Sequence, residues 1–364
     1  MKLLLLAGEE SGVLYAEKIR AEVLKRAPDA EIRGYGDAGF KVADLAVMGF
    51  GQVLRKIFYF LRVKRTMERV IADWRPDVVC TVDYPGLNLK LAAFAKARGI
   101  RTVHVVCPQV WAWKKGRIPK IEAALDKLCC FFPFEPTLFR PGFAEFVGHP
   151  LADAFERFEK FEKFEGERVL AVLPGSRIGE IEKHMPVLLK AVEGLRDDLQ
   201  LGDAGLKIVI PAANDKAYCK IVELMAPQNQ AISVVRGRAR EILRRADAAV
   251  VASGTATLEA ALAGCPTVLV YRVGWLFAFL ARRLIKGVKH IGLANIIAEK
   301  AGVPCPMPEL LQEDFTADSV LKHLKPWLAD ESANAAARRS LARSMSFLKS
   351  DGRAICQIVQ VIFG

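Results

Sequence analysis

The sequence predicts an α/β protein built from two similar halves. Short apolar runs alternate with stretches of 3.6-residue periodicity, a pattern typical of parallel strands covered by helices on both faces. The 364 residues suffice for two domains, each large enough for its own core. The segment 155–167 (FERFEKFEKFEGE) has strand-like runs on both sides, so we interpret it as a charged connector between the halves.

The elements follow in chain order. Eight runs are expected to be strands: Leu3–Leu6, Val78–Val82, Thr102–Val106, Leu128–Phe132, Val169–Leu173, Leu206–Ile210, Ala248–Val251 and Thr267–Tyr271. Glu31–Arg33 is expected to add a short strand. Only helical pattern remains from Asp318 to Phe363. We therefore predict domains at 1–160 and 167–345, with a last helix at 346–364 that packs back on the first domain.

The first strand leads into AGEESG at 7–12 and then into a helix. Small residues at such a turn allow close backbone approach, and a helix N-terminus favours an anion. Glu10, Ser11 and Gly12 are therefore candidate cleft residues, while a purely structural turn is the alternative. GYGDAG at 34–39 matches the GxGxxG fingerprint, but it follows the second strand, so we interpret it as a loop.

Asp83 ends the third expected strand and precedes Tyr84-Pro85-Gly86. A carboxylate at the carboxyl end of a central strand points toward a cleft, where a general base is needed. Trp111 and Trp113 follow the next strand in the motif CPQVWAW. They predict a surface for a sugar or an acyl chain, with core packing as the alternative for one of them.

Two turns of the second half, LPGSR at 173–177 and SGTATLE at 253–259, also follow expected strands. Their backbone N–H groups, the Arg177 charge and their hydroxyls form a diphosphate receptor that requires no metal. Ser253 or Thr255 is expected to cap the second helix. Glu259 either holds ribose hydroxyls or is a solvated helix residue. The predicted donor-binding residues here are Gly175, Ser176, Arg177, Ser253, Gly254, Thr255 and Glu259.

Several site types are disfavoured. The chain has no Asp-x-Asp and no G-x-x-x-x-G-K-[ST] motif, which argues against a chelated metal and a common NTPase loop. Its eight cysteines show no metal-binding spacing and its five histidines are scattered. We expect no metal and no cofactor, and a reducing, cytoplasmic environment.

The chain has 53 Lys and Arg but only 41 Asp and Glu, which gives a net charge of +12. This positive net charge favours an anionic binding partner. The basic segments Arg55–Arg75 and Arg272–Lys289 also carry large apolar residues, which suits a lipid surface better than nucleic acid. We expect docking on an anionic membrane through Gln52–Arg65, aided by Trp275–Lys286; ordinary amphipathic helices are the alternative. The longest apolar stretch, Val273–Ala281, is too short to span a membrane, and MKLLLLAGEESG is not expected to be a signal peptide.

In their order, these motifs resemble those of lipid-A-disaccharide synthase, a family of membrane-associated glycosyltransferases. The resemblance implies a GT-B fold, in which two Rossmann-like domains face a central cleft. The matching stretches span nearly the whole chain: AGEESG (7–12), LAVMGF (45–50), PDVVCTVDYPGLNL (76–89), HVVCPQVWAWKKGRI (104–118), FFPFEP (131–136), FVGHPLAD (146–153), LPGSRIGEIE (173–182), SGTATLEAALAGCPTVLVYR (253–272), ANIIA (294–298) and PELLQ (308–312).

The resemblance implies transfer of 2,3-diacylglucosamine from UDP to 2,3-diacylglucosamine 1-phosphate (lipid X). The products are a β-1,6-linked disaccharide 1-phosphate and UDP, with inversion at the anomeric carbon. Asp83 matches an aspartate thought to be catalytic, Arg177 matches the arginine of LPGSR, and Asn295 matches the asparagine of LPN, adding it to the donor-binding residues. The resemblance also implies a cytoplasmic location at the inner membrane. It does not decide between a monomer and a homodimer.

The chain departs from the family pattern in its first half. The family's SGD is Ser11-Gly12-Val13 here, PDFN is Pro85-Gly86-Leu87-Asn88, and SPSVWAW is CPQVWAW. Two carboxylates are therefore missing near the expected acceptor site, so the donor chemistry is better defined than the acceptor. Alternatives are a UDP-sugar glycosyltransferase with another lipid acceptor, an enzyme similar to UDP-GlcNAc epimerase, and a non-catalytic membrane-binding paralogue.

Overall fold

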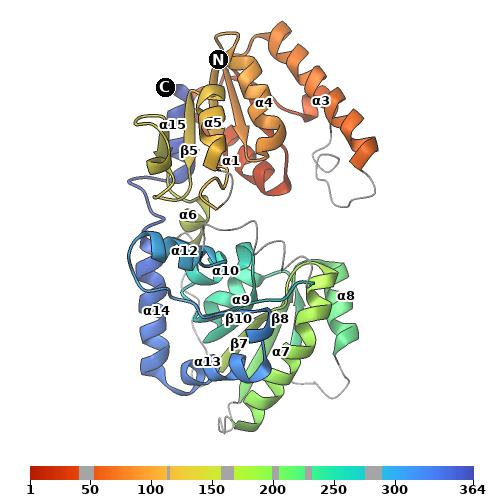
Figure 1. Cartoon of the computed structure of the whole chain (residues 1–364), viewed down its shortest axis with the longest axis vertical. Coiled ribbons are helices and arrows are strands. Elements are labelled where there is room, and N and C mark those ends of the chain that lie inside the picture. Colours follow the sequence, from red (N-terminus) through yellow and green to blue (C-terminus); the bar gives the residue numbers. More distant parts are fainter. Residues whose placement is uncertain (41–52, 113–114, 157–167, 199–204, 226–231, 275–288) are drawn as a thin grey trace. The chain divides into compact units, whose positions relative to one another are not determined.

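A computed structural model divides the chain into two compact units (Figure 1). The first comprises Met1–Asp153 and Leu348–Gly364, and the second comprises Ala154–Phe347. The structure describes residues 1–40, 53–112, 115–156, 168–198, 205–225, 232–274 and 289–364. Most of the expected connector, 157–167, lies outside the described residues.

The first unit contains a sheet of six parallel strands in the order β2-β1-β3-β4-β5-β6. The strands are β1 (Lys2–Ala7), β2 (Glu31–Arg33), β3 (Val78–Val82), β4 (Arg101–Val105), β5 (Lys127–Cys130) and β6 (Ala144–Phe146). The register pairs Ala7 with Val82 and Val82 with Val105. The carboxyl ends of β1, β3 and β4 therefore lie side by side, and the turns after them share one edge of the sheet.

Helices cover both faces of this sheet, because alternate residues of each strand point to opposite faces. Leu3 and Leu5 of β1 pack toward Ile19 and Ile358, whereas Leu4 and Leu6 pack toward the opposite helices. One face carries α1 (Glu10–Arg26) and α15 (Ala354–Phe363), and the other carries α3 (Val53–Trp74), α4 (Pro85–Lys96) and α5 (Ile118–Ala124). The predicted return of the last helix is confirmed: α15 lies against α1 (Figure 1).

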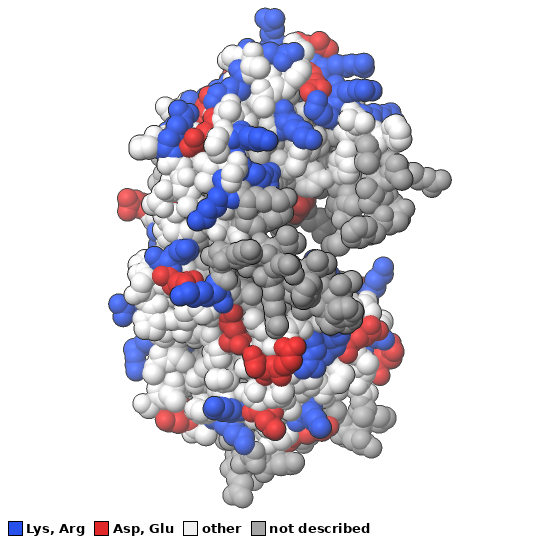
Figure 2. Space-filling model, in the orientation of Figure 1, with Lys and Arg blue, Asp and Glu red and all other residues white. Residues whose placement is uncertain are grey.

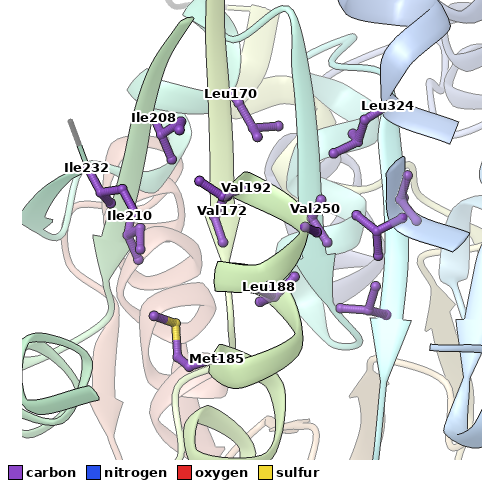
Figure 3. Close-up of a cluster of buried hydrophobic side chains, with 14 of the residues drawn as sticks. Leu170, Val172, Met185, Leu188, Val192, Ile208, Ile210, Ile232, Val250 and Leu324 are labelled. Atoms are coloured by element: carbon purple, nitrogen blue, oxygen red, sulfur yellow. The ribbon is translucent and has the colours of Figure 1, made fainter. Parts of the chain in front are cut away.

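The second unit contains another sheet of six parallel strands, in the order β12-β11-β10-β7-β8-β9. The strands are β7 (Arg168–Leu173), β8 (Leu206–Ala212), β9 (Ile232–Arg236), β10 (Ala248–Ala252), β11 (Thr267–Tyr271) and β12 (Glu309–Leu311). In Figure 3, Leu170 and Val172 of β7 share one buried cluster with Met185, Leu188 and Val192 of the adjacent helix.

The helices of this unit also cover both faces. α7 (Ile178–Asp198), α8 (Asp215–Leu224) and α13 (Ala317–Ala329) pack on one face, and α9 (Ala239–Arg245) and α10 (Thr255–Leu262) on the other. α12 (Leu293–Lys300) and α14 (Glu331–Ser346) pack against α10. α6 (Pro150–Glu156) contains the division between the units, and short 3-10 turns occur at Gly36–Ala38, Lys115–Arg117, Pro136–Leu138 and Gln312–Asp314.

All nine predicted strands are confirmed, with ends shifted by a few residues. The pattern missed β6, β9 and β12, which are edge strands of the two sheets. An edge strand is half-exposed, so it need not be a continuous apolar run; β6 has no fully buried residue. Among the described residues we find no helix that combines the length and the hydrophobicity needed to cross a bilayer.

Candidate active site

Asp83 follows the last residue of β3 and has a strained backbone. Its φ is 50° and that of Tyr84 is 52°, so two successive non-glycine residues adopt the left-handed conformation. The Asp83 N–H donates to Val105 O (2.9 Å), and the Tyr84 N–H donates to Asp83 Oδ1 (2.8 Å). These bonds hold the carboxylate at the shared carboxyl edge of the sheet, as the sequence predicts.

A buried amide supports this strained turn. Asn88 Nδ2 donates to Asp83 O (2.7 Å), Val82 O (3.2 Å) and Leu6 O (3.3 Å), which ties the ends of β1 and β3 together. Tyr35 in turn donates its hydroxyl to Asn88 Oδ1 (2.7 Å). Asn88 is fully buried and Tyr35 nearly so. The sequence analysis missed both residues, although Asn88 lies in the PGLN motif.

Two carboxylates come close at this edge. Burial raises the pKa of Asp83, while the hydrogen bond from the Tyr84 N–H opposes the shift. Burial and the Asp83 charge raise the pKa of Glu9. Glu9 directly precedes α1, and the sequence analysis did not single it out. A Cβ on Gly8 would lie 2.5 Å from the Tyr84 ring, so this turn requires glycine.

The predicted cleft residues of AGEESG differ from expectation in one respect. Helix α1 begins at Glu10, so Glu10, Ser11 and Gly12 form its first turn rather than a loop before it. Gly12 is buried, and a Cβ there would lie 3.4 Å from Val82 O. The side chains of Glu10 and Ser11 lie outside the described residues.

The tryptophan prediction requires a correction. Trp111 is buried, with only 7% of its surface exposed, and it donates its indole N–H to Glu135 Oε1 (3.2 Å). The ring therefore packs in the core and does not form a binding surface. Trp113 lies outside the described residues.

The carboxylate that holds Trp111 belongs to a buried cluster. Sulfur atoms of Cys107 and Cys130 and a Glu135 oxygen lie within 4.8 Å of one another. Burial raises the pKa of Glu135 to about 8, opposed by hydrogen bonds from N–H groups that include Phe132 N. A hydrogen bond to Cys107, followed by burial, raises the pKa of Cys130. Protonated thiols are poor metal ligands and nucleophiles, so we interpret this cluster as a packing element.

The LPGSR turn connects β7 to α7. Gly175 has φ 122°, and a Cβ there would lie 2.7 Å from Glu180 Oε2, so glycine is required. The Arg177 side chain is 63% exposed and its Nη1 lies 3.0 Å from Glu180 Oε1. The N–H groups that begin an α-helix generally have no acceptor within it; in α7, the Glu180 and Ile181 N–H groups donate to Arg177 O (both 3.0 Å). The turn thus presents a cation beside a helix N-terminus, an arrangement suited to a phosphate.

A buried histidine, which the sequence analysis missed, holds this turn in place. His184 Nδ1 lies 2.7 Å from Pro174 O, and its Nε2 accepts the Arg272 N–H (2.9 Å). Burial lowers the pKa of His184, so the ring is neutral at pH 7. A proton on Nδ1 satisfies both bonds. The ring therefore connects the end of β7 to the end of β11.

The SGTATLE turn follows β10, which is the neighbour of β7 in the sheet. Helix α10 begins at Thr255, and Gly254, with φ 152°, occupies the cap position without a side-chain hydrogen bond. The prediction that Ser253 or Thr255 caps this helix is wrong. The Ser253 N–H donates to Val270 O (3.0 Å). Because β7 and β10 are adjacent, Gly175–Arg177 and Ser253–Thr255 meet at one edge of the sheet.

Two further predicted donor residues already have partners. Glu259 Oε1 accepts a hydrogen bond from Arg240 Nε (2.8 Å), so the carboxylate is not simply solvated. Asn295 is buried; its Nδ2 donates to Met307 O (2.8 Å) and Glu309 Oε1 (2.8 Å), and its Oδ1 accepts the Met307 N–H (3.0 Å). Asn295 therefore holds the segment leading into β12.

The chain contains two α/β units, each with a sheet of parallel strands and glycine-containing turns at the carboxyl edge of that sheet. These features define a GT-B fold. Solved structures share it: a Listeria monocytogenes protein described as a UDP-N-acetylglucosamine 2-epimerase has a TM-score of 0.61 at 14% identity, covering 93% of this chain and 90% of that one. The calicheamicin glycosyltransferase CalG4 has a TM-score of 0.55 at 16% identity, covering 95% and 94%. At such identities the likeness concerns the fold alone.

Sequence comparison defines the family. The Lipid-A-disaccharide synthetase family profile matches residues 3–361. The lipid-A-disaccharide synthase of Geobacter sulfurreducens is 34% identical, covering 96% of this chain and 94% of that protein. That of Chromohalobacter salexigens is 35% identical, covering 91% and 89%. The chain therefore belongs to the lipid-A-disaccharide synthase family and is a glycosyltransferase.

Proposed function

We propose that the enzyme transfers 2,3-diacylglucosamine from UDP to the 6-hydroxyl of 2,3-diacylglucosamine 1-phosphate, with inversion and without a metal. The observation that carries this proposal is the Asp83 carboxylate, held at the carboxyl end of β3 with a raised pKa. A carboxylate with a raised pKa is a stronger base than an ordinary one, which favours proton removal from a hydroxyl.

In the proposed step, the Asp83 carboxylate accepts the proton of the acceptor hydroxyl. The hydroxyl oxygen forms the new bond to the anomeric carbon as the bond to the UDP oxygen breaks. The bonding electron pair leaves with UDP, so negative charge develops on its phosphate. Arg177 and the N-termini of α7 and α10 supply positive charge for that group. Attack opposite the leaving group inverts the anomeric carbon.

We also propose that the enzyme works from the cytoplasm on an anionic inner-membrane surface, through α3. Phe58 is 73% exposed and Leu61 42% exposed, and Arg62 and Arg65 are exposed on the same helix. Lys and Arg side chains are prominent over the first unit on the face that Figure 2 shows. An amphipathic helix with this composition suits a lipid interface.

The membrane prediction needs one adjustment. Phe60 is half-buried: it packs against the core cluster of the first unit and against Tyr84, with ring centroids 6.4 Å apart, so it is not on the exposed docking face. The side chain of Ile57 and the whole of Gln52 and Trp275–Lys286 lie outside the described residues.

Incubation of the purified protein with UDP-2,3-diacylglucosamine and 2,3-diacylglucosamine 1-phosphate tests the proposal. The expected products are UDP and a β-1,6-linked disaccharide 1-phosphate, identified by mass spectrometry and NMR. Activity should persist in EDTA. A sugar epimer without disaccharide would instead indicate an epimerase, and no reaction would indicate a non-catalytic paralogue.

A further inference from the structure

A cavity of about 400 Å³ lies between α3 and α4 in the first unit, a volume typical of ligand sites. Its apolar lining comes from Phe60 and Leu61 of α3 and from Tyr84 and Leu87 at the start of α4. The two helices lie side by side (Figure 1). Tyr84, which lines the cavity, is the next residue in the sequence after Asp83, the proposed catalytic base.

The polar lining of this cavity is cationic. Lys64 and Lys90 contribute to its wall, and none of the lining residues that the structure describes is acidic. Lys64 Nζ lies 2.5 Å from Glu68 Oε1, so part of its charge is neutralised. Lys90 is exposed, and in the described part of the chain we find no ion pair for it. An apolar cavity with a cation at its wall suits an amphiphile with an acyl chain and an anionic head.

Gly86, the second residue of α4, also lines the cavity and adds no charge to its wall. A Cβ at Gly86 would meet no atom within 4 Å, so the glycine faces open space and an aspartate would fit. Such a carboxylate would stand beside the cavity and repel an anion.

We propose that this cavity binds an acyl chain of the acceptor, with the acceptor's phosphate drawn to Lys90. The proposal rests on the proposed function, since that function supplies an acylated sugar phosphate. Binding here would hold the acceptor in the same unit as Asp83. Because Gly86 adds no negative charge, this part of the wall does not repel the phosphate.

Direct binding measurements test the proposed ligand chemistry without requiring turnover. Octyl phosphate, octyl glucoside and inorganic phosphate are compared below micelle-forming concentrations by calorimetry. We expect octyl phosphate to bind most tightly, because it alone carries both a chain and a charge. Equal binding of octyl glucoside, or tight binding of inorganic phosphate, would overturn the proposal.

Two variants locate the binding. Lys90→Gln should weaken octyl phosphate binding about three- to tenfold and Gly86→Asp about tenfold or more. Aspartate at the second position of a helix is favourable, so Gly86→Asp should not lower the unfolding midpoint. The exposed Lys18 of α1 provides a matched control, because Lys18→Gln removes the same charge elsewhere on the unit. Unchanged binding in both cavity variants would overturn the proposal.

Steady-state kinetics distinguish a failure of the cavity assignment from a failure of the proposed reaction. With lipid X as acceptor, both variants should raise the acceptor KM and leave the donor KM unchanged. Disaccharide synthesis with an unchanged acceptor KM would overturn the cavity assignment and leave the proposed function intact. Reduced binding to phosphatidic acid vesicles with an unchanged acceptor KM would identify a membrane lipid as the occupant. Variant-sensitive octyl phosphate binding without any disaccharide would support the cavity and refute the reaction.

Discussion

Asp83 is the residue on which the proposed chemistry depends. Asp83→Asn keeps the shape and the hydrogen bond from the Tyr84 N–H but removes the base, so kcat should fall roughly 10²- to 10⁴-fold. UDP affinity should hardly change, because the donor turns belong to the other unit. Steady-state kinetics and UDP calorimetry measure both, with the exposed Asp29→Asn as control. Near-normal turnover in Asp83→Asn would contradict the assignment.

The pH dependence of the reaction has a definite sign. A base must be deprotonated, and burial raises the pKa of Asp83 above its usual value of 3.8. Activity should therefore fall on acidification at a higher pH than an ordinary aspartate would require. An acidic limb at the usual pH of an exposed aspartate would show that the carboxylate is not buried during catalysis.

Tyr35 acts on Asp83 only through Asn88, so we regard both as positioning residues. Tyr35→Phe leaves the buried Asn88 Oδ1 without its donor, which should cost about 1–3 kcal/mol of stability. It should also lower kcat more than it changes the donor KM. Tyr218→Phe, which removes a hydroxyl from the second unit, is the control. A stability loss with unchanged kcat and pH profile would mean that the network is structural only.

Arg177 is expected to stabilise the leaving UDP. Loss of such a donor typically costs about 3–4 kcal/mol in the transition state, so Arg177→Ala should lose most of its rate. Arg238→Ala is a close control, because Arg238 forms an ion pair with a Glu three residues later and is also 63% exposed. Rescue of Arg177→Ala by Mg²⁺, or loss of wild-type activity in EDTA, would refute the metal-free scheme.

Among the helices, α3 has two distinct faces. Val63, Met67 and Ile71 are fully buried against the sheet, while Phe58 and Leu61 are exposed. Phe58→Ser/Leu61→Ser should reduce binding to anionic vesicles at least about tenfold without unfolding the protein. Binding should also weaken with salt and be absent on neutral vesicles.

Liposome sedimentation measures this binding. Leu14→Ser is the matched control, because Leu14 is 60% exposed on α1 of the same unit. Equal sedimentation of the double variant and the wild type would show that α3 is an ordinary packed helix.

Across the whole molecule, the end of the chain stabilises its beginning. Ile358 of α15 is fully buried with Ile19 and Val105 in the first unit. Ile358→Ala should cost about 2–5 kcal/mol, whereas Phe363→Ala, 44% exposed on the same helix, should cost little. Hydrogen exchange should quicken within 1–153 and much less within 154–347. Uniform loss of protection in both units would show that they unfold together.

The local pattern of the chain determined the fold class, the central strands and the two turns of the donor unit. Strands buried on both faces must be continuously apolar, and the turns after them need glycine, so both leave a signal in the sequence. The same logic located Asp83 at the end of β3. Edge strands and helix starts leave weaker signals in the sequence, because half-exposed strands need not be continuously apolar and a cap such as Gly254 has no side chain to indicate it.

Only the tertiary structure decided which side chains meet. Tyr35 lies 53 residues from Asn88, and Trp111 lies 24 residues from Glu135. No local pattern indicates such pairs, because they form when distant segments converge on one sheet edge. The fold decided burial in the same way, because it buries Trp111, half-buries Phe60 and leaves Phe58 exposed. The sequence determines the chemistry of each side chain, but the partners and the exposure of that side chain depend on what the fold packs around it.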